Sequence, residues 1–192
     1  MKVIEIMKLS AEMLGLNQIH KTLIEATEET ESEVLAQDEI AKMLSLFELS
    51  VQELCTNYIS VYVEEEIEIS GNKFALSQLN NFVKVVSVSN ENGLIKHKII
   101  NRNLVVESDG KYVVKYCTYP TIKTLFADID FLTEFSPDVL VLGLCSYFTV
   151  AMGMFKEFEI FHEQYLEKAN TFKNLRLFEL PLRRWEWFLK RN

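Results

Sequence analysis

Residues 58–72 read YISVYVEEEIEISGN, and they mark the point at which the hydrophobic period of the chain changes. Before them, apolar residues recur every three or four positions, as on one face of a helix. From Val61 to Ile69 the period shortens to two and β-branched residues take over, which indicates a strand. Gly71 and Asn72 then supply a turn, because both residue types tolerate a positive φ. We therefore expect helical structure to give way to β structure near residue 60.

Four further strand-sized runs follow this turn, at residues 82–88, 94–100, 104–107 and 111–117. Turn sequences separate them, at Asn92-Gly93, Asn101-Arg102-Asn103 and Asp109-Gly110. Asn-Gly and Asp-Gly favour tight hairpins, since both residues reach positive φ at little cost. The sequence therefore predicts an antiparallel β meander over about residues 61–126, with its clearest hairpin at Asp109-Gly110.

Helices are predicted on both sides of this β module, over about residues 3–16, 31–60, 137–152 and 155–173. Three of them space their apolar residues three and four apart, and so carry one apolar face. These faces are Ile6, Leu9, Met13 and Leu16 in the first helix, Ile40, Leu44, Phe47, Val51, Leu54 and Tyr58 in the second, and Phe158, Phe161, Tyr165, Ala169 and Phe172 in the last. The third helix is apolar on most sides, so we expect it to lie inside a helical bundle.

Local signals indicate the helix ends. Gly15 is expected to stop the first helix. Thr30 followed by Glu33 has the spacing of a capping box for the second helix. Ser136-Pro137-Asp138 combines a capping hydroxyl with a proline at the first helical position, and Gly153 is expected to end the helix that it opens.

Together these elements predict an α+β fold, in which N- and C-terminal helices form a bundle and the β meander is inserted between them. Residues 1–174 are expected to form a single globular domain, because 192 residues with 48% hydrophobic residues suit one ordinary core. Residues 175–192 would form an extended or helical C-terminal tail.

Composition excludes several classes of protein. The net charge of −8 argues against sequence-independent binding of nucleic acid, which needs a surplus of Lys and Arg. Cys55, Cys117 and Cys145 are odd in number and widely spaced, so we expect reduced packing residues of a protein made in a cytoplasm. Residues 139–155 lack charge but fall short of the ~20 residues of a membrane span, so a buried helix is favoured. Glu5 argues against a signal peptide.

The C-terminal tail is basic and aromatic, whereas the rest of the chain is acidic. We expect it to dock on a partner, because aromatic residues and Arg are enriched at the centres of interfaces. The candidate docking residues are Phe178, Leu180, Leu182, Arg183, Arg184, Trp185, Trp187, Phe188, Lys190 and Arg191. The alternative is a terminal amphipathic helix folded back on the chain's own bundle.

Catalytic and metal-binding patterns are absent from the sequence or incomplete in it. Its glycines have the wrong spacing for nucleotide-binding loops and for the serine-hydrolase elbow. Glu159 and His162 form one Glu-x-x-His, whereas a di-iron bundle needs two such motifs and further carboxylates. The run Glu64-Glu65-Glu66 is expected to be an exposed strand edge and is a candidate subunit contact. We therefore predict no catalytic residue and no cofactor, and a small metal protein using Glu159 and His162 stays as an alternative.

The order of these elements resembles that of the head-to-tail connector, or portal adaptor, proteins of tailed bacteriophages, which have N-terminal helices, a small β insertion and two further helices. The resemblance is carried by residues 82–88 (FVKVVSV), 103–106 (NLVV), 109–116 (DGKYVVKY), Tyr119-Pro120, Phe135-Ser136-Pro137 and residues 165–169 (YLEKA). It spans about residues 1–174. It departs at residues 76–79 (LSQL), where family members often carry a proline.

The resemblance implies a structural, non-enzymatic subunit of the virion. It implies a homo-oligomeric ring, dodecameric in the family, at the neck between capsid and tail. The C-terminal segment would grip the portal protein, and a tail or neck protein would bind on the other side. DNA would pass through without specific binding, no membrane would be involved, and assembly would take place in the host bacterial cytoplasm. The residues alone also permit a non-viral intracellular interaction domain whose tail binds another acidic partner.

Overall fold

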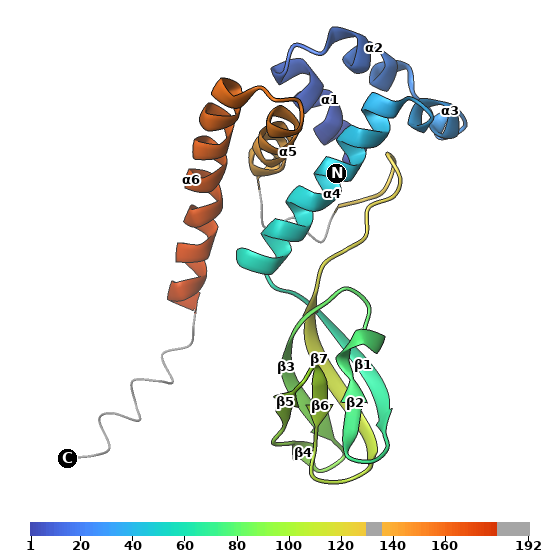
Figure 1. Ribbon diagram of the computed structural model, residues 1–192, viewed down its shortest axis with the longest axis vertical. Coiled ribbons are helices and arrows are strands. Elements are labelled where there is room, and N and C mark those ends of the chain that lie inside the picture. Colours follow the sequence, from blue (N-terminus) through green and yellow to red (C-terminus); the bar gives the residue numbers. More distant parts are fainter. Residues whose placement is uncertain (130–135, 180–192) are drawn as a thin grey trace, which may run out of the picture. The chain divides into compact units, whose positions relative to one another are not determined.

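The computed structural model describes residues 1–129 and 136–179, which form helices and antiparallel sheets (Figure 1). The predicted α+β class is confirmed. By their contacts the residues group into two compact units. The β unit is Val51–Ile122, and the helical unit consists of Met1–Ser50 and Lys123–Asn192.

The chain begins with two short helices in place of one. The helix α1 (Val3–Met13) ends before Gly15, whose φ of +69° turns the chain and confirms the predicted stop. The helix α2 (Asn17–Glu25) follows directly and buries Ile19 and Leu23. The sequence pattern did not predict α2, because its apolar residues are few.

The buried face of α1 differs from the predicted one. Ile6 is buried as expected, but Leu9 and Met13 are 46% and 50% exposed. The buried side instead includes Ser10, whose backbone carbonyl accepts the Cys145 thiol at 3.9 Å. A small residue lets a neighbouring helix approach closely, so the tertiary packing overrides the simple apolar count here.

The predicted long helix over residues 31–60 is interrupted. The structure has a short α3 (Glu31–Leu35) and a separate α4 (Asp38–Asn57). The capping box predicted at the start of this region is absent from the structure, since the Thr30 hydroxyl makes no cap bond to α3. It accepts the backbone N–H of Thr27 at 2.9 Å instead, and such local side-chain bonds compete with capping.

The apolar stripe of α4 is confirmed. Its predicted residues Ile40, Leu44, Phe47, Val51 and Leu54 are all buried. The last predicted member, Tyr58, lies one residue beyond the helix and is half-buried. The spacing of three and four therefore identified the buried side of this helix correctly.

The helix α5 (Pro137–Ala151) is buried on most sides, as predicted, with Pro137 at its first position. The predicted cap by the Ser136 hydroxyl does not form. Instead the Ser136 backbone carbonyl accepts the N–H of Val139 at 3.1 Å. Across residues 1–129 and 136–179, every helix is too short or too polar to cross a membrane.

The helix α6 (Phe155–Glu179) follows Gly153, which has a φ of +73°, and packs beside α5 (Figure 1). Tyr165 and Ala169 on its predicted face are fully buried, and Phe158 and Phe161 are half-buried. The helix is longer than predicted. Residues 175–179 belong to α6 rather than to a separate tail.

The β unit contains two antiparallel sheets, with the strand orders β1-β7-β3-β4 and β2-β6-β5. The strands are β1 (Val61–Ile69), β2 (Lys73–Ala75), β3 (Phe82–Asn90), β4 (Gly93–Leu94), β5 (Lys98–Ile100), β6 (Asn103–Val105) and β7 (Gly110–Thr118). A short 3-10 helix, η1 (Leu76–Gln78), follows β2. A bridge between Ser70 and Lys73 closes the predicted turn at residues 71–72.

The predicted meander is correct for two consecutive antiparallel pairs, β3–β4 and β5–β6. It is wrong for β7, which lies between β1 and β3 and does not pair with β6. The Asp109-Gly110 hairpin is therefore also wrong. The β1–β7 ladder joins two nine-residue strands along their full length, from Val61–Thr118 to Ile69–Gly110, whereas β6 offers three residues. The longer ladder forms more backbone hydrogen bonds, so it outweighs the local turn signal.

The two sheets share one hydrophobic core. Its buried residues come from the strands of both sheets and from the segment around η1: Ile67, Ile69, Leu76, Leu79, Val88, Leu104, Val106, Tyr112, Val114 and Tyr116. Alternate residues of β1 and β7 thus face this core, which is the usual pattern of packed sheets.

Candidate functional site

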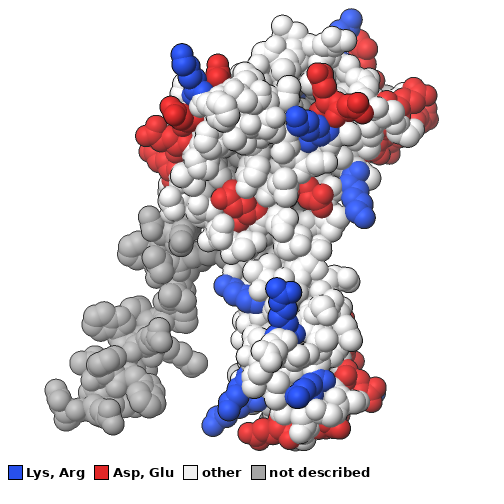
Figure 2. Space-filling view, in the orientation of Figure 1, with Lys and Arg blue, Asp and Glu red and all other residues white. Residues whose placement is uncertain are grey.

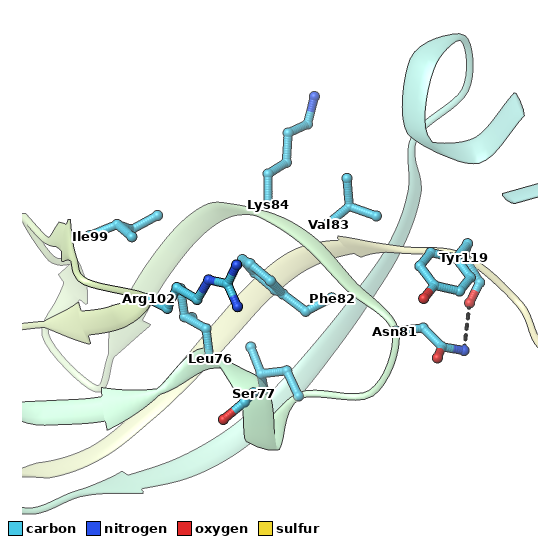
Figure 3. A pocket seen from close by; sticks show the side chains of 10 residues that line it. Leu76, Ser77, Asn81, Phe82, Val83, Lys84, Ile99, Arg102 and Tyr119 are labelled. Atoms are coloured by element: carbon cyan, nitrogen blue, oxygen red, sulfur yellow. Dashed lines mark hydrogen bonds between the residues drawn. The ribbon is translucent and has the colours of Figure 1, made fainter. Parts of the chain in front are cut away.

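A pocket of about 600 Å³ opens in the β unit beside the start of β3 (Figure 3). Its walls come from η1 and the loop after it, from β3, from β5 and from the β5–β6 turn. The lining residues are Leu76, Ser77, Leu79, Asn81, Phe82, Val83, Lys84, Ile99, Arg102 and Tyr119. A volume of this size is typical of pockets that bind ligands.

The pocket lies where strand pairing stops. β5 is the last strand of its sheet, and β4 pairs with β3 at Ser89 and Asn90, near the end of β3. Register shifts between Phe82 and Lys84 and between Val85 and Ser87 bend the first half of β3, as β-bulges do. In the first half of β3, the side that faces away from β7 has no partner among the described strands. The side of β5 that faces away from β6 has none either, and the pocket lies beside both.

One end of the pocket is held by Asn81. Its side-chain Nδ2 donates to the backbone carbonyl of Tyr119 at 2.9 Å (Figure 3). The same Nδ2 donates to Thr121 Oγ1 at 2.8 Å. Asn81 has a φ of +48°, a conformation that Asn adopts more readily than most residues. These bonds tie the loop before β3 to the segment after β7.

The other end is formed by the turn Asn101-Arg102, which joins β5 to β6. Both residues have positive φ, +50° and +61°, as a two-residue hairpin requires. The Arg102 backbone carbonyl accepts the N–H of Leu76 at 3.0 Å, which fixes the turn against η1. This conformation is costly for Arg, and it places the Arg102 side chain in the pocket lining (Figure 3).

The charged residues of the lining are both basic. Arg102 lies beside the apolar residues Leu76 and Phe82, and Lys84 projects from the bend of β3 (Figure 3). The chain as a whole has a net charge of −8, whereas the pocket lining has two basic residues and no carboxylate. The pocket is therefore more positive than the rest of the chain. Such a site suits a ligand with an apolar body and a negative group.

The predicted acidic run Glu64-Glu65-Glu66 lies on β1, which is an edge strand of its sheet. Its members do not form one surface. Glu64 is exposed and pairs with Lys115 at 2.8 Å, and Glu66 is also exposed. Glu65 is half-buried, and its Oε2 accepts the hydroxyl of Tyr116 at 3.0 Å. Burial, and secondarily the bond to Glu65, raise the pKa of Tyr116.

The alternative metal site at Glu159 and His162 has a different environment. Glu159 is exposed, whereas His162 is half-buried, lies 3.1 Å by its Nδ1 from the Ser146 hydroxyl, and stacks on Phe158 at 4.8 Å between ring centroids. Within the described ranges, no cluster of three or more His, Cys, Asp or Glu could hold a metal ion. The contacts of His162 are those of a residue that joins α5 to α6.

The three cysteines are free and buried, as predicted. Burial raises the pKa of Cys55 and of Cys145 to about 12. A thiol with such a pKa is not a nucleophile at neutral pH. Both side chains therefore act as small apolar packing groups.

The predicted docking tail lies outside the described residues from Leu180 onward. Phe178 belongs to α6, and its side chain also lies outside the described part. The helical unit does have a shallow groove of about 430 Å³, lined by α1, α5 and α6. The exposed Leu9 and Met13 of α1 form part of it.

The sequence pattern missed the pocket of the β unit. Its residues come from three separate stretches, at 76–84, 99–102 and 119, and strand pairing brings them together. One sequence feature could have pointed to the pocket. It is the turn Asn101-Arg102-Asn103, which has an Arg and no glycine.

Comparison of the sequence with models of protein families finds no match, and a search of curated proteins finds none either.

Proposed function

We propose that this chain is a structural subunit of a bacteriophage neck, which forms an adaptor ring between the portal and the tail. The observation that carries the proposal is the order of elements: helices up to Asn57, an antiparallel β unit from Val61 to Thr118, and the two helices α5 and α6. This is the order implied by the resemblance to connector proteins. Because one fold can serve many functions, the test of this proposal uses the assembly itself.

Surface chemistry supports an assembling subunit. Several large apolar side chains are more than half exposed, including Ile24, Leu94, Phe155 and Ile160. These residues belong to α2, β4 and α6, so they offer separate points of contact to a partner rather than one apolar patch. Each such residue could contribute about 2 kcal/mol if an interface removed it from water.

The charge distribution suits a DNA conduit. Between Glu25 and Glu39 the chain has seven acidic residues and no Lys or Arg, and acidic side chains gather over α3 in Figure 2. An acidic surface repels the phosphate backbone, so DNA would slide past without binding. In this proposal the basic, aromatic tail docks on the portal protein. Assembly into the ring places the acidic residues between Glu25 and Glu39 beside the path of the DNA.

The decisive experiment mixes the purified chain with its portal protein and counts rings bound to portals by negative-stain imaging. A variant that ends at Glu179 keeps all of α6 and removes residues 180–192. We expect it to keep the far-UV circular dichroism and denaturation midpoint of the full chain but to lose portal binding.

A matched variant replaces Trp185, Trp187 and Phe188 by Ala and keeps the basic charges. We expect this variant to bind the portal at least about tenfold more weakly, because interface aromatics carry a large share of binding energy. Undiminished binding by the chain that ends at Glu179 would show that the tail is not the docking element. Failure of the full chain to bind portals would refute the proposed function.

A further inference from the structure

Strand β5 presents an open edge beside the pocket of the β unit. It pairs with β6 through Ile100–Asn103 and Ile99–Leu104, across the two-residue turn. In such hairpins the pair next to the turn exchanges both backbone hydrogen bonds, and bonded pairs alternate along the ladder. The N–H and C=O of Ile99 therefore point away from β6, outward from the open edge of the sheet.

This edge is apolar as well as open. Ile99 and Ile100 are 52% and 50% exposed, and all of β5 lies at the surface. Proteins often keep such edges short or charged, because they accept strands from other chains. β5 has three residues and one of them is Lys98, but the other two are apolar. Here Ile99 also lines the pocket, so the edge and the pocket form one continuous surface.

The charges around this surface are positive. Lys98 begins β5 and is exposed, and Arg102 and Lys84 line the pocket. A basic or neutral strand would gain little from these residues, whereas an acidic strand would pair with them. In Figure 2 the visible face of the β unit carries Lys and Arg side chains, and Asp and Glu side chains gather toward its lower end.

We propose that the open edge of β5 and the adjoining pocket bind an extended, acidic segment of a partner polypeptide as an added β-strand. The backbone of that segment pairs with Ile99. One of its apolar side chains enters the pocket against Leu76 and Phe82, and its carboxylates pair with Arg102 and Lys84. Backbone pairing supplies affinity in this mode of recognition, and the pocket and charges supply selectivity. The inference goes beyond the proposed ring and does not depend on it.

The test uses the full chain and a short capped peptide in which Glu alternates with Val and Phe. Isothermal titration calorimetry measures its affinity, and amide chemical shifts of isotope-labelled protein locate the contact. We expect saturable binding that weakens with added salt, with the largest shifts in β5 and the first half of β3. A peptide with Lys in place of each Glu is expected to bind at least about tenfold more weakly.

The protein variant is Lys84→Glu combined with Arg102→Asp, since Asp tolerates the positive φ of position 102 better than most residues. Its matched control, Lys21→Glu with Lys123→Glu, makes the same change in net charge at two exposed positions of the helical unit. We expect about a tenfold or larger loss of affinity in the first variant and wild-type affinity in the control. Equal affinities in both, or no binding of the acidic peptide to the wild type, overturn the proposal.

Strand addition is separated from simple charge attraction by a peptide with N-methyl groups on alternate amides. N-methylation on the side that faces β5 removes the backbone donors and is expected to abolish binding, whereas methylation on the opposite side is expected to preserve it. If both methylated peptides bind as well as the parent, the segment does not add as a strand. If a single-stranded DNA oligomer binds this edge and the peptide does not, the partner is not a polypeptide.

Discussion

Gly143 on α5 illustrates what a single residue contributes to the helical unit. A methyl group added there would lie 3.1 Å from Tyr165 Cε2 on α6 and 3.4 Å from Ser50 Cβ on α4. Few real side chains tolerate contacts as short as the first of these. The absence of a side chain at position 143 therefore permits these helices to meet.

We predict that Gly143→Ala destabilises the protein by about 1 kcal/mol. Overpacking costs about 1–3 kcal/mol, and the higher helix propensity of Ala returns up to about 1 kcal/mol. The control is Ser45→Ala on the exposed side of α4, which changes helix propensity without a new contact. Denaturant unfolding measures both variants, and an unchanged or higher midpoint for Gly143→Ala would contradict the close approach.

The buried thiols predict an effect of alkaline pH. Burial raises the pKa of Cys145 from 9.0 to about 12, so the folded state favours the protonated thiol. The protonated Cys145 thiol contributes fully to stability below pH 9, and this contribution is lost as pH rises through about 12. We expect the free energy of unfolding to fall by up to about 1.4 kcal/mol per pH unit for this thiol above pH 9.

The variant Cys145→Ala isolates that effect, because the other titrating groups are common to both proteins. Its unfolding free energy should decline less steeply than that of the wild type above pH 9. Parallel declines would mean that Cys145 does not remain protonated in the folded state.

At the scale of elements, β1 and β7 organise the β unit, and the loop before β7 depends on Asp109. The Asp109 Oδ1 accepts the backbone N–H of Asn72 at 2.7 Å. Hydrogen bonds from Asn72 and Gly71 lower the pKa of Asp109 from its ordinary 3.8. One carboxylate thus joins the β1–β2 turn to the start of β7.

We predict that Asp109→Ala lowers the thermal midpoint, whereas Glu107→Ala, at an exposed position two residues earlier, leaves it nearly unchanged. Because the pKa of Asp109 is lowered by folding, its contribution is present above pH 3.8 and is lost as pH falls through the lowered pKa. The difference between wild type and Asp109→Ala should therefore shrink at acid pH. A difference that is independent of pH would show that the charge of Asp109 does not matter.

A second contact at this scale joins the two segments of the helical unit, Met1–Ser50 and the one that begins at Lys123. The N–H groups of Val3 and Ile4 donate to Ala127 and Leu125 at 3.0 and 2.7 Å, and the N–H of Ile129 donates to Met1. The start of the chain is thus paired with the segment that follows the β unit. The helical unit cannot form from residues before the β unit alone.

At the scale of the whole molecule, each unit has its own buried residues. The core of the β unit lies entirely within Val51–Ile122. We predict that a fragment of residues 58–122 folds and unfolds cooperatively, whereas residues 1–57 without 123–192 do not. Circular dichroism and thermal melts decide this, and a fragment 58–122 without a cooperative transition would contradict it.

Much of the secondary structure was predictable from local pattern. The spacing of Ile40, Leu44 and Phe47 identified α4, and the composition of residues 139–149 identified the buried α5. Periodicity succeeds there because a helix with one apolar face has one way to bury it. The pattern of α1 failed, because the small Ser10 faces α5 while Leu9 stays exposed.

The amino-acid sequence by itself determined the α+β class, the α4 stripe, the turn at residues 71–72 and the reduced state of the cysteines, because these depend on neighbours in the chain and on composition. Tertiary structure alone decided the pairing of β7 with β1 and β3, the inward position of Glu65, and the pocket between β3 and β5. These features depend on which strands, distant in sequence, can form the longest ladder of backbone hydrogen bonds with one another. That competition involves residues far apart in the chain, so no local pattern encodes its outcome.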